Sequence, residues 1–216
     1  MKKLIIFDLD GTFIEYHCRF RHIVRIMLWQ TLGYPTHEVA SYNFMVGNGI
    51  NKLFERALPE GEKTEENVLR VRKEFLLHYD RHNADESRPY PGIPELLETL
   101  QHKGYKLAVA SNKYQAATEK LIAHYFPGIR FVAVFGQREG VKVKPDPAVV
   151  HDILQIAGVS KDEVLYVGDS GVDMQTAINS GVTSCGVTWG FRPRTELESF
   201  CPDYIVDKAE TILSIV

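Results

Sequence analysis

Long apolar runs and an excess of one charge are both missing from this chain of 216 residues, and each absence excludes a class of protein. No apolar stretch approaches membrane-spanning length, and the run after Lys2 and Lys3 breaks at Asp8, too early for a signal peptide. The formal net charge is only −3, so bulk charge favours neither a nucleic-acid partner nor an acidic membrane. The remaining expectation is a soluble globular protein.

Cysteine is also scarce. Cys18, Cys185 and Cys201 are odd in number and far apart, so they form neither a disulfide framework nor a metal-ligand spacing. Cys185 lies in an apolar, strand-like run and is expected to be a small core residue. This cysteine usage favours a reducing, cytoplasmic location.

What the chain does have is an alternation of apolar runs and amphipathic stretches. Continuous apolar strands separated by helices indicate a parallel sheet covered on both faces, which is a doubly wound, Rossmann-like α/β core. We expect strands at 3–7, 107–111, 131–135, 164–168 and 182–187, a weak last strand at 204–206, and helices at 93–101, 116–124, 148–157 and 174–179.

The segment 14–90 breaks this alternation. Its apolar residues keep helical spacing and no convincing strand appears, so it reads as a cap of about four helices inserted after the first core strand. The core is then 1–13 and 91–216, with the return marked by Pro89-Tyr90-Pro91-Gly92. Ligands of open α/β sheets bind beyond the carboxyl ends of the strands, so an insertion rooted there could act as a lid.

Two carboxylates end the first strand: Asp8 and Asp10 precede Gly11 and Thr12. Acids crowded at the tip of an apolar strand carry a desolvation and repulsion cost that Mg²⁺ would relieve. One Asp could attack a phosphoryl group while the other handles the proton. The alternative is an Asp-rich turn, since Asp and Gly are common turn residues.

Three further motifs follow later strands. The hydroxyl of Ser111 and the backbone N–H groups after it suit phosphate oxygens, unless Ser111 is only a helix N-cap. Lys144, before Pro145, could offset charge near a phosphoryl group, although most lysines are ordinary surface residues. Asp169 and Asp173 again crowd a strand end, or else they merely favour a helix N-terminus.

Taken in order, these motifs resemble those of the haloacid dehalogenase-like hydrolase superfamily. Within it, the cap stretch Met45-Val46-Gly47-Asn48-Gly49-Ile50 and the segment from Tyr90 to Tyr105 resemble phosphoglycolate phosphatases. The resemblance implies a Mg²⁺-dependent phosphatase that hydrolyses a small phosphorylated metabolite through an aspartyl-phosphate intermediate.

The resemblance also implies a role for each motif. Asp8 would be the nucleophile and Asp10 the acid and base, with Ser111, Asn112 and Lys144 binding the phosphoryl oxygens. Mg²⁺ would be held by Asp8, the Asp10 carbonyl oxygen and Asp169, and Asp173 would act through water or by orienting Lys144. The turn Gly47-Asn48-Gly49 would contact the substrate, unless it only connects two helices.

Other activities of the superfamily stay open. A phosphosugar mutase would retain all four motifs, and a phosphatase of sugar phosphates or nucleotides would too. A dehalogenase is disfavoured by Asp10 and Thr12, and a non-catalytic binder by the complete motif set. Phe13, Glu15 and Tyr16 depart from the usual pattern where the chain enters the cap, which bears on the substrate preference and not on the chemistry. The basic segment Arg19–His22 is expected to be a solvated helix face, unless one of its arginines meets a substrate carboxylate or a second phosphate.

Overall fold

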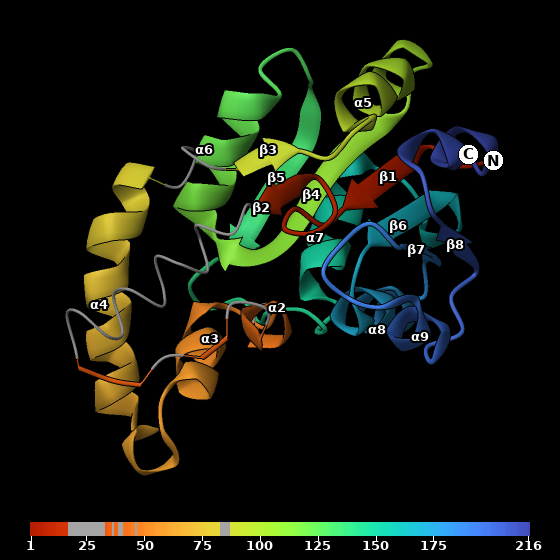
Figure 1. Ribbon diagram of the computed structural model, residues 1–216. Helices are drawn as coiled ribbons and strands as arrows, with labels where there is room; N and C mark the ends of the chain where they lie inside the picture. Colours follow the sequence, from red (N-terminus) through yellow and green to blue (C-terminus); the bar gives the residue numbers. More distant parts are fainter. Residues whose placement is uncertain (17–32, 36, 39–40, 46, 83–86) are drawn as a thin grey trace.

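A six-stranded parallel sheet forms the centre of the computed structural model, which describes residues 1–16, 33–35, 37–38, 41–45, 47–82 and 87–216 (Figure 1). Its strand order is β5-β4-β1-β6-β7-β8. The first strand of the chain is therefore central, which brings its end beside the ends of β4 and β6. The strands are β1 (Leu4–Phe7), β4 (Lys106–Tyr114), β5 (Phe131–Gln137), β6 (Val164–Gly168), β7 (Thr183–Val187) and β8 (Tyr204–Val206).

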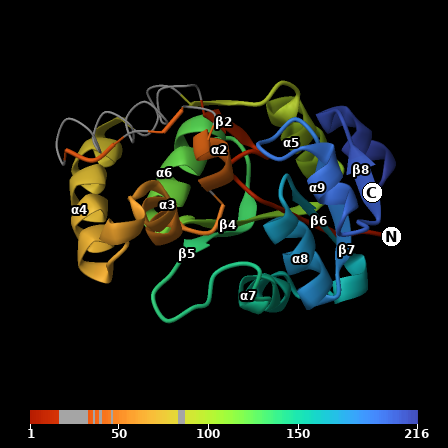
Figure 2. The same ribbon diagram turned by 60° about the horizontal axis from the view of Figure 1, so that its bottom comes forward.

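Alternating side chains of β1 enter two separate cores. Ile5 and Phe7 pack in one apolar cluster, and Leu4 and Ile6 pack in another on the opposite face. Helices α5 and α6 cover the first face, and α7 and α8 cover the second (Figure 2). The doubly wound α/β fold predicted from the sequence is confirmed. The helices of this part are α5 (Ile93–His102), α6 (Gln115–Tyr125), α7 (Ala148–Ala157), α8 (Gly171–Ser180) and α9 (Arg194–Glu198), with 3₁₀ turns η4 (Lys161–Glu163) and η5 (Ala209–Ser214).

The inserted segment builds its own apolar cluster to one side of the sheet (Figure 1). Phe54 and Phe75 meet at its centre, with ring centroids 5.3 Å apart. Ala117 of α6 belongs to the same cluster, so the cap packs on the core through this helix. The described elements are α2 (Tyr42–Met45), α3 (Ile50–Ala57), η3 (Glu60–Glu62) and α4 (Glu65–His82). Of the four helices expected in 14–90, the first, which the spacing of Ile23, Ile26, Met27 and Leu32 predicts, lies outside the described residues, as does the basic segment Arg19–His22.

Two short strands join the cap to the core, where the sequence was expected to hold none. β2 (Ile14–Tyr16) pairs antiparallel with β3 (Ser87–Pro89). Opposite one another in this ribbon, Arg88 and Glu15 form an ion pair of 2.8 Å. Strands of three residues are too short to show an alternating pattern, which is why periodicity missed them. The absence of strands predicted for 14–90 is therefore wrong at both ends of that segment.

Two remaining expectations concern cysteines and membranes. Cys185 is fully buried in β7, as its apolar surroundings predicted, and Cys201 is exposed. Over the described part of the chain, no helix is both long and apolar enough to cross a membrane.

Candidate active site

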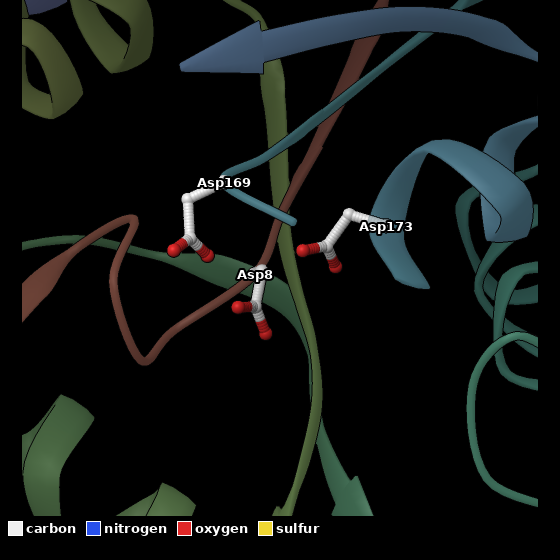
Figure 3. A group of neighbouring side chains, drawn as sticks. All are labelled: Asp8, Asp169 and Asp173. Atoms are coloured by element: carbon white, nitrogen blue, oxygen red, sulfur yellow. The ribbon is translucent and has the colours of Figure 1, made fainter. Parts of the chain in front are cut away.

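Three aspartates converge at the carboxyl end of the central strands (Figure 3). Asp8 directly follows β1, Asp169 directly follows β6, and Asp173 lies in the first turn of α8. All three are buried, and each offers a carboxylate oxygen within 4.8 Å of the others. The backbone keeps this arrangement because the Asp8 N–H continues the sheet with a 2.9 Å hydrogen bond to the Val167 carbonyl.

Lys144 joins two of these carboxylates. Its Nζ lies 2.8 Å from Asp8 Oδ1 and 2.7 Å from Asp173 Oδ1, and the lysine side chain is only 3% exposed. The other oxygen of Asp173 accepts hydrogen bonds from the Ser170 hydroxyl and backbone N–H, at 2.6 and 3.1 Å. Asp173 thus combines the two interpretations of its position, because it caps α8 and also contacts Lys144.

The site carries an excess of buried negative charge. Burial raises the pKa of Asp8 to about 7, although the neighbouring Lys144 charge opposes the rise. Burial and the charges of Asp173 and Asp8 raise the pKa of Asp169 well above its usual range. Burial alone would lower the pKa of Lys144, but the same two charges outweigh it and raise that pKa strongly. One ammonium does not balance three carboxylates.

Asp169 sits in a close-fitting cradle. Its Oδ2 accepts a 2.7 Å hydrogen bond from the Phe191 N–H. Two glycines lie directly against this side chain. A Cβ on Gly11 would lie 2.4 Å from Asp169 Oδ2, and a Cβ on Gly190 would lie 2.3 Å from Asp169 Cβ. Gly11 has a φ of +91°, a conformation that L side chains rarely adopt. These glycines fix where the carboxylate can point.

Asp10 lines the same pocket and forms an ion pair with Lys113. The distance from Lys113 Nζ to Asp10 Oδ2 is 3.3 Å, and the lysine side chain is 7% exposed. Lys113 directly follows the predicted phosphate-binding pair Ser111 and Asn112, but it was not among the site residues predicted from the sequence. In the sequence, its only signal was its place directly after this pair.

Ser111 and Asn112 are buried within β4, which runs to Tyr114 and is longer than predicted. Since α6 starts only at Gln115, Ser111 is not a helix N-cap. The side-chain amide of Asn112 accepts a 2.8 Å hydrogen bond from the Lys144 N–H and donates one of 3.0 Å to the Lys144 carbonyl. This side chain, and not only the backbone expected to matter, fixes the loop that carries Lys144.

A pocket joins these groups to the cap. Its core side contains every predicted catalytic, metal-binding and phosphate-binding residue, and its cap side is mostly apolar. The lining residues are Asp8, Asp10, Ser111, Asn112, Lys113, Tyr114, Lys144, Asp169, Ser170, Asp173, Phe191 and Arg192 from the core, and Gly47, Gly49, Ile50, Leu53 and Phe75 from the cap.

The cap turn reaches the pocket through its two glycines. Gly47 and Gly49 both have positive φ, +105° and +84°, and both line the pocket. The side chain of Asn48 takes a different direction: its Oδ1 accepts a 2.8 Å hydrogen bond from Arg56. Of the three residues predicted to contact substrate, the structure places the glycines beside the pocket and Asn48 within the cap's own hydrogen-bond network.

Proteins named phosphoglycolate phosphatase are similar to almost the whole chain. A phosphoglycolate phosphatase of Haemophilus influenzae is 31% identical over 220 residues, which cover 99% of this chain and 98% of that protein. One of Aquifex aeolicus is 29% identical, with coverage of 99% and 96%. The crystal structure of a predicted phosphoglycolate phosphatase from Haemophilus somnus superposes with a TM-score of 0.90 at 29% identity, covering 99% of this chain and 97% of that one.

The family model described as haloacid dehalogenase-like hydrolase matches residues 5–187. This range contains the whole cap and all four motifs, from Asp8 to Asp173. The match extends over most of the chain, and the motifs within it meet in one pocket. The chain therefore belongs to the haloacid dehalogenase-like hydrolase family, as the order of its motifs predicted.

Proposed function

We propose that the protein is a Mg²⁺-dependent phosphatase that hydrolyses a small, phosphoglycolate-like monoester through an aspartyl-phosphate. The observation that carries the proposal is the buried contact between Asp8 and Lys144, at the end of the central strand and facing the pocket. It pairs a potential nucleophile with a cation that can neutralise a phosphoryl group. The relatives named phosphoglycolate phosphatase support the same activity. With its dispersed cysteines, the enzyme would work in the cytoplasm.

The donor set suits Mg²⁺. The cluster offers hard carboxylate oxygens. Burial, and then the charges of neighbouring aspartates, raise the pKa values of Asp8 and Asp169, and a divalent cation would offset this cost of the charged forms. Asp8, the Asp10 carbonyl oxygen and Asp169 would hold the ion, while Asp173 remains committed to Lys144 and Ser170. When bound, the ion supplies charge neutralisation at the phosphoryl oxygens.

In the first step, a carboxylate oxygen of Asp8 attacks phosphorus and the bond from phosphorus to the ester oxygen breaks. Asp10, in its protonated form, gives its proton to the departing alkoxide, and the alcohol leaves. Lys144 and the Ser111 hydroxyl bind the phosphoryl oxygens, assisted by the Asn112 backbone. Phosphoryl transfer depends mainly on such positioning and charge neutralisation.

In the second step, water attacks phosphorus of the aspartyl-phosphate. Asp10, now a carboxylate, takes the proton from this water, and the bond from phosphorus to the Asp8 oxygen breaks. Inorganic phosphate leaves and Asp8 returns to its starting form. Lys113, 3.3 Å from Asp10, is placed to keep that carboxylate at the pocket.

The segment 14–90 would act as a lid that selects the leaving group. The core motifs would contact only the phosphoryl group and the metal, and every phosphate ester has the same phosphoryl group. The cap supplies the wall beyond it, through Gly47, Gly49 and the apolar residues Ile50, Leu53 and Phe75. This wall lies next to the phosphate-binding residues, since the Gly47 carbonyl accepts a hydrogen bond from Asn112, and so it favours a small substrate.

The test is release of inorganic phosphate from a panel of esters, with Mg²⁺ and with a chelator. The panel contains p-nitrophenyl phosphate, phosphoglycolate, hexose phosphates and nucleotides. We expect turnover only with Mg²⁺ and the highest kcat/KM for phosphoglycolate. Absence of turnover on every ester would refute the phosphatase, and conversion of a hexose phosphate to its isomer would identify a mutase instead.

A further inference from the structure

We infer that Trp189 is a positioning residue for the proposed Mg²⁺ site. It holds the loop after β7 against the turn that follows Asp8, so that the backbone of this loop orients the carboxylate of Asp169. The inference rests on the metal site of the proposed function and extends it to a residue outside the four motifs.

Trp189 fastens its loop to a turn that is itself fixed. The indole is half-buried and packs against the apolar core on one face of the sheet. Its Nε1 donates a 3.1 Å hydrogen bond to the carbonyl of Thr12, a fully buried residue. The turn around Thr12 is closed, because the N–H groups of Phe13 and Ile14 both donate to the Leu9 carbonyl, at 2.9 and 3.0 Å. The anchor of the indole therefore has a defined position relative to the end of β1.

The two residues after Trp189 both contact Asp169. A Cβ on Gly190 would lie 2.3 Å from Asp169 Cβ and 2.5 Å from the Gly11 carbonyl oxygen, so the backbone of this glycine lies between the aspartate and the turn. The next residue, Phe191, donates its N–H to Asp169 Oδ2 in a 2.7 Å hydrogen bond. A shift of Trp189 would therefore displace the N–H group that binds Asp169.

Asp169 needs this support because its neighbours repel it. All three aspartates are buried, and Asp8 and Asp173 each place a carboxylate oxygen within 4.8 Å of one of its own. Without metal, an unsupported carboxylate would turn away from these two like charges. The hydrogen bond to Oδ2 opposes that rotation and favours the ionised form, which is the form that binds a divalent cation. A group that holds a metal ligand in place raises metal affinity without touching the ion.

An indole suits this task for two reasons. It has a single donor, so the hydrogen bond to Thr12 fixes its orientation, and its large apolar body resists displacement once it is packed. A phenyl ring would keep most of the packing and lose the donor. Trp189→Phe is therefore a specific probe of this hydrogen bond.

The experiment measures Mg²⁺ binding through thermal stability, without substrate. Metal is first removed with a chelator, and Tm is then followed as Mg²⁺ is added back to the dialysed protein. Trp189→Phe should need about three- to tenfold more Mg²⁺ than the parent for the same rise in Tm, less than the roughly 10- to 100-fold typical of a group that binds a metal ligand directly. Each rise is measured from the variant's own metal-free Tm, so a general loss of stability does not count as a loss of binding.

Thr188→Val is the matched control. It removes a hydrogen-bonding group from the adjacent residue of the same loop and keeps the shape of the side chain. The Thr188 hydroxyl donates a 2.6 Å hydrogen bond to Asp207, directly after β8, and not to the turn around Thr12. The Mg²⁺ response of this variant should match that of the parent even if its metal-free Tm falls. Equal shifts in Thr188→Val and Trp189→Phe would overturn the inference.

A double variant asks whether Trp189 acts through Asp169. In an Asp169→Asn background, Trp189→Phe should cause no further loss of the Mg²⁺ response, because the metal ligand that the loop orients is already missing. Additive losses would place the effect of Trp189 elsewhere and overturn the inference. A Trp189→Phe variant that responds to Mg²⁺ as the parent does would overturn it as well.

Phosphate release by the same proteins keeps this result separate from the proposed function. A parent that responds to Mg²⁺ but hydrolyses no ester would refute the phosphatase and leave the role of Trp189 intact. A parent that hydrolyses esters, with an unchanged Mg²⁺ response in Trp189→Phe, would overturn the role of Trp189 and leave the phosphatase intact. A parent whose Tm does not respond to Mg²⁺ would overturn both the metal site and the inference.

Discussion

Asn112 in the core and Gly47 in the cap are linked directly: the side-chain Nδ2 of Asn112 donates a 2.9 Å hydrogen bond to the Gly47 carbonyl. The same amide group binds the N–H and the carbonyl of Lys144. One buried side chain therefore connects the cap turn to the loop that carries Lys144.

Asn112→Ala should impair both stability and turnover. It leaves the backbone groups of Lys144 without these partners, and each buried group costs about 1–3 kcal/mol when unsatisfied. We expect a lower free energy of unfolding by about 2 kcal/mol or more and a reduced kcat. Chemical denaturation and steady-state kinetics measure the two effects.

Asn179→Ala is its control, because Asn179 donates a 2.8 Å hydrogen bond to the neighbouring Pro145 carbonyl at the surface. The Asn179→Ala substitution should change the free energy of unfolding and kcat only little. An Asn112→Ala variant as stable and active as the parent would show that this amide positions nothing of consequence.

Asp8→Asn should abolish turnover and stabilise the metal-free protein at neutral pH. Burial raises the Asp8 pKa from 3.8 to about 7, so between these values the unfolded chain loses a proton that the folded protein keeps. The free energy of unfolding of the parent therefore falls as pH rises through this window. The free energies of unfolding of variant and parent should be equal near pH 3.8. Above about pH 7, that of the variant should be larger by roughly 2–4 kcal/mol.

Urea denaturation in the presence of a chelator, repeated across this pH range, measures the difference. Asp152→Asn, which breaks a half-exposed pair with Arg138, should instead give a curve parallel to the parent. A parallel curve for Asp8→Asn, or turnover within tenfold of the parent, would contradict the prediction.

Asp169→Asn should weaken Mg²⁺ binding. The substitution keeps the shape of a side chain that Gly11 and Gly190 tightly enclose, but it removes one negative charge from the proposed metal site. In the parent, Mg²⁺ should raise Tm progressively with concentration, since it binds the folded protein. In the variant, this rise should need at least tenfold more Mg²⁺, whereas Asp152→Asn should respond as the parent does. Equal Mg²⁺ responses would remove Asp169 from the metal site.

Asp10→Asn should slow both chemical steps, because one group acts first as acid and then as base. An ester with a very good leaving group needs little protonation, so its phosphorylation step should suffer less. Single-turnover measurements with substituted phenyl phosphates separate the two steps. Equal losses for good and poor leaving groups would count against the acid role.

Gly49→Val should reduce kcat/KM for phosphoglycolate more than for p-nitrophenyl phosphate. The glycine has φ +84° beside the pocket, and a Cβ there would lie 3.4 Å from Gln137 Oε1. Gly140→Val introduces comparable backbone strain at φ +73° in open space, and it should leave the substrate preference unchanged. Asn48→Ala should act in the same direction as Gly49→Val but more weakly, since Asn48 binds Arg56. Comparable losses on both substrates would remove this turn from the site.

Sequence reasoning found what short local patterns encode. Asp8 and Asp169 were recognisable because each follows a continuous apolar run, and the family order of the motifs placed Lys144 beside them. It missed β2 and β3, whose three-residue strands gain their meaning only from pairing across more than seventy residues. It also missed the place of Arg192 in the lining of the pocket, because that place depends on the folding of the whole chain and no neighbouring residue in the sequence indicates it.

The β2–β3 ribbon has one more consequence. Both passages of the chain between core and cap run through adjacent strands, paired from Ile14 with Pro89 to Tyr16 with Ser87. The whole cap can therefore be exchanged for that of a relative by two splices at neighbouring points, without rerouting any strand of the main sheet. Such chimaeras would transfer the choice of substrate as a module while the phosphoryl chemistry stays with the recipient.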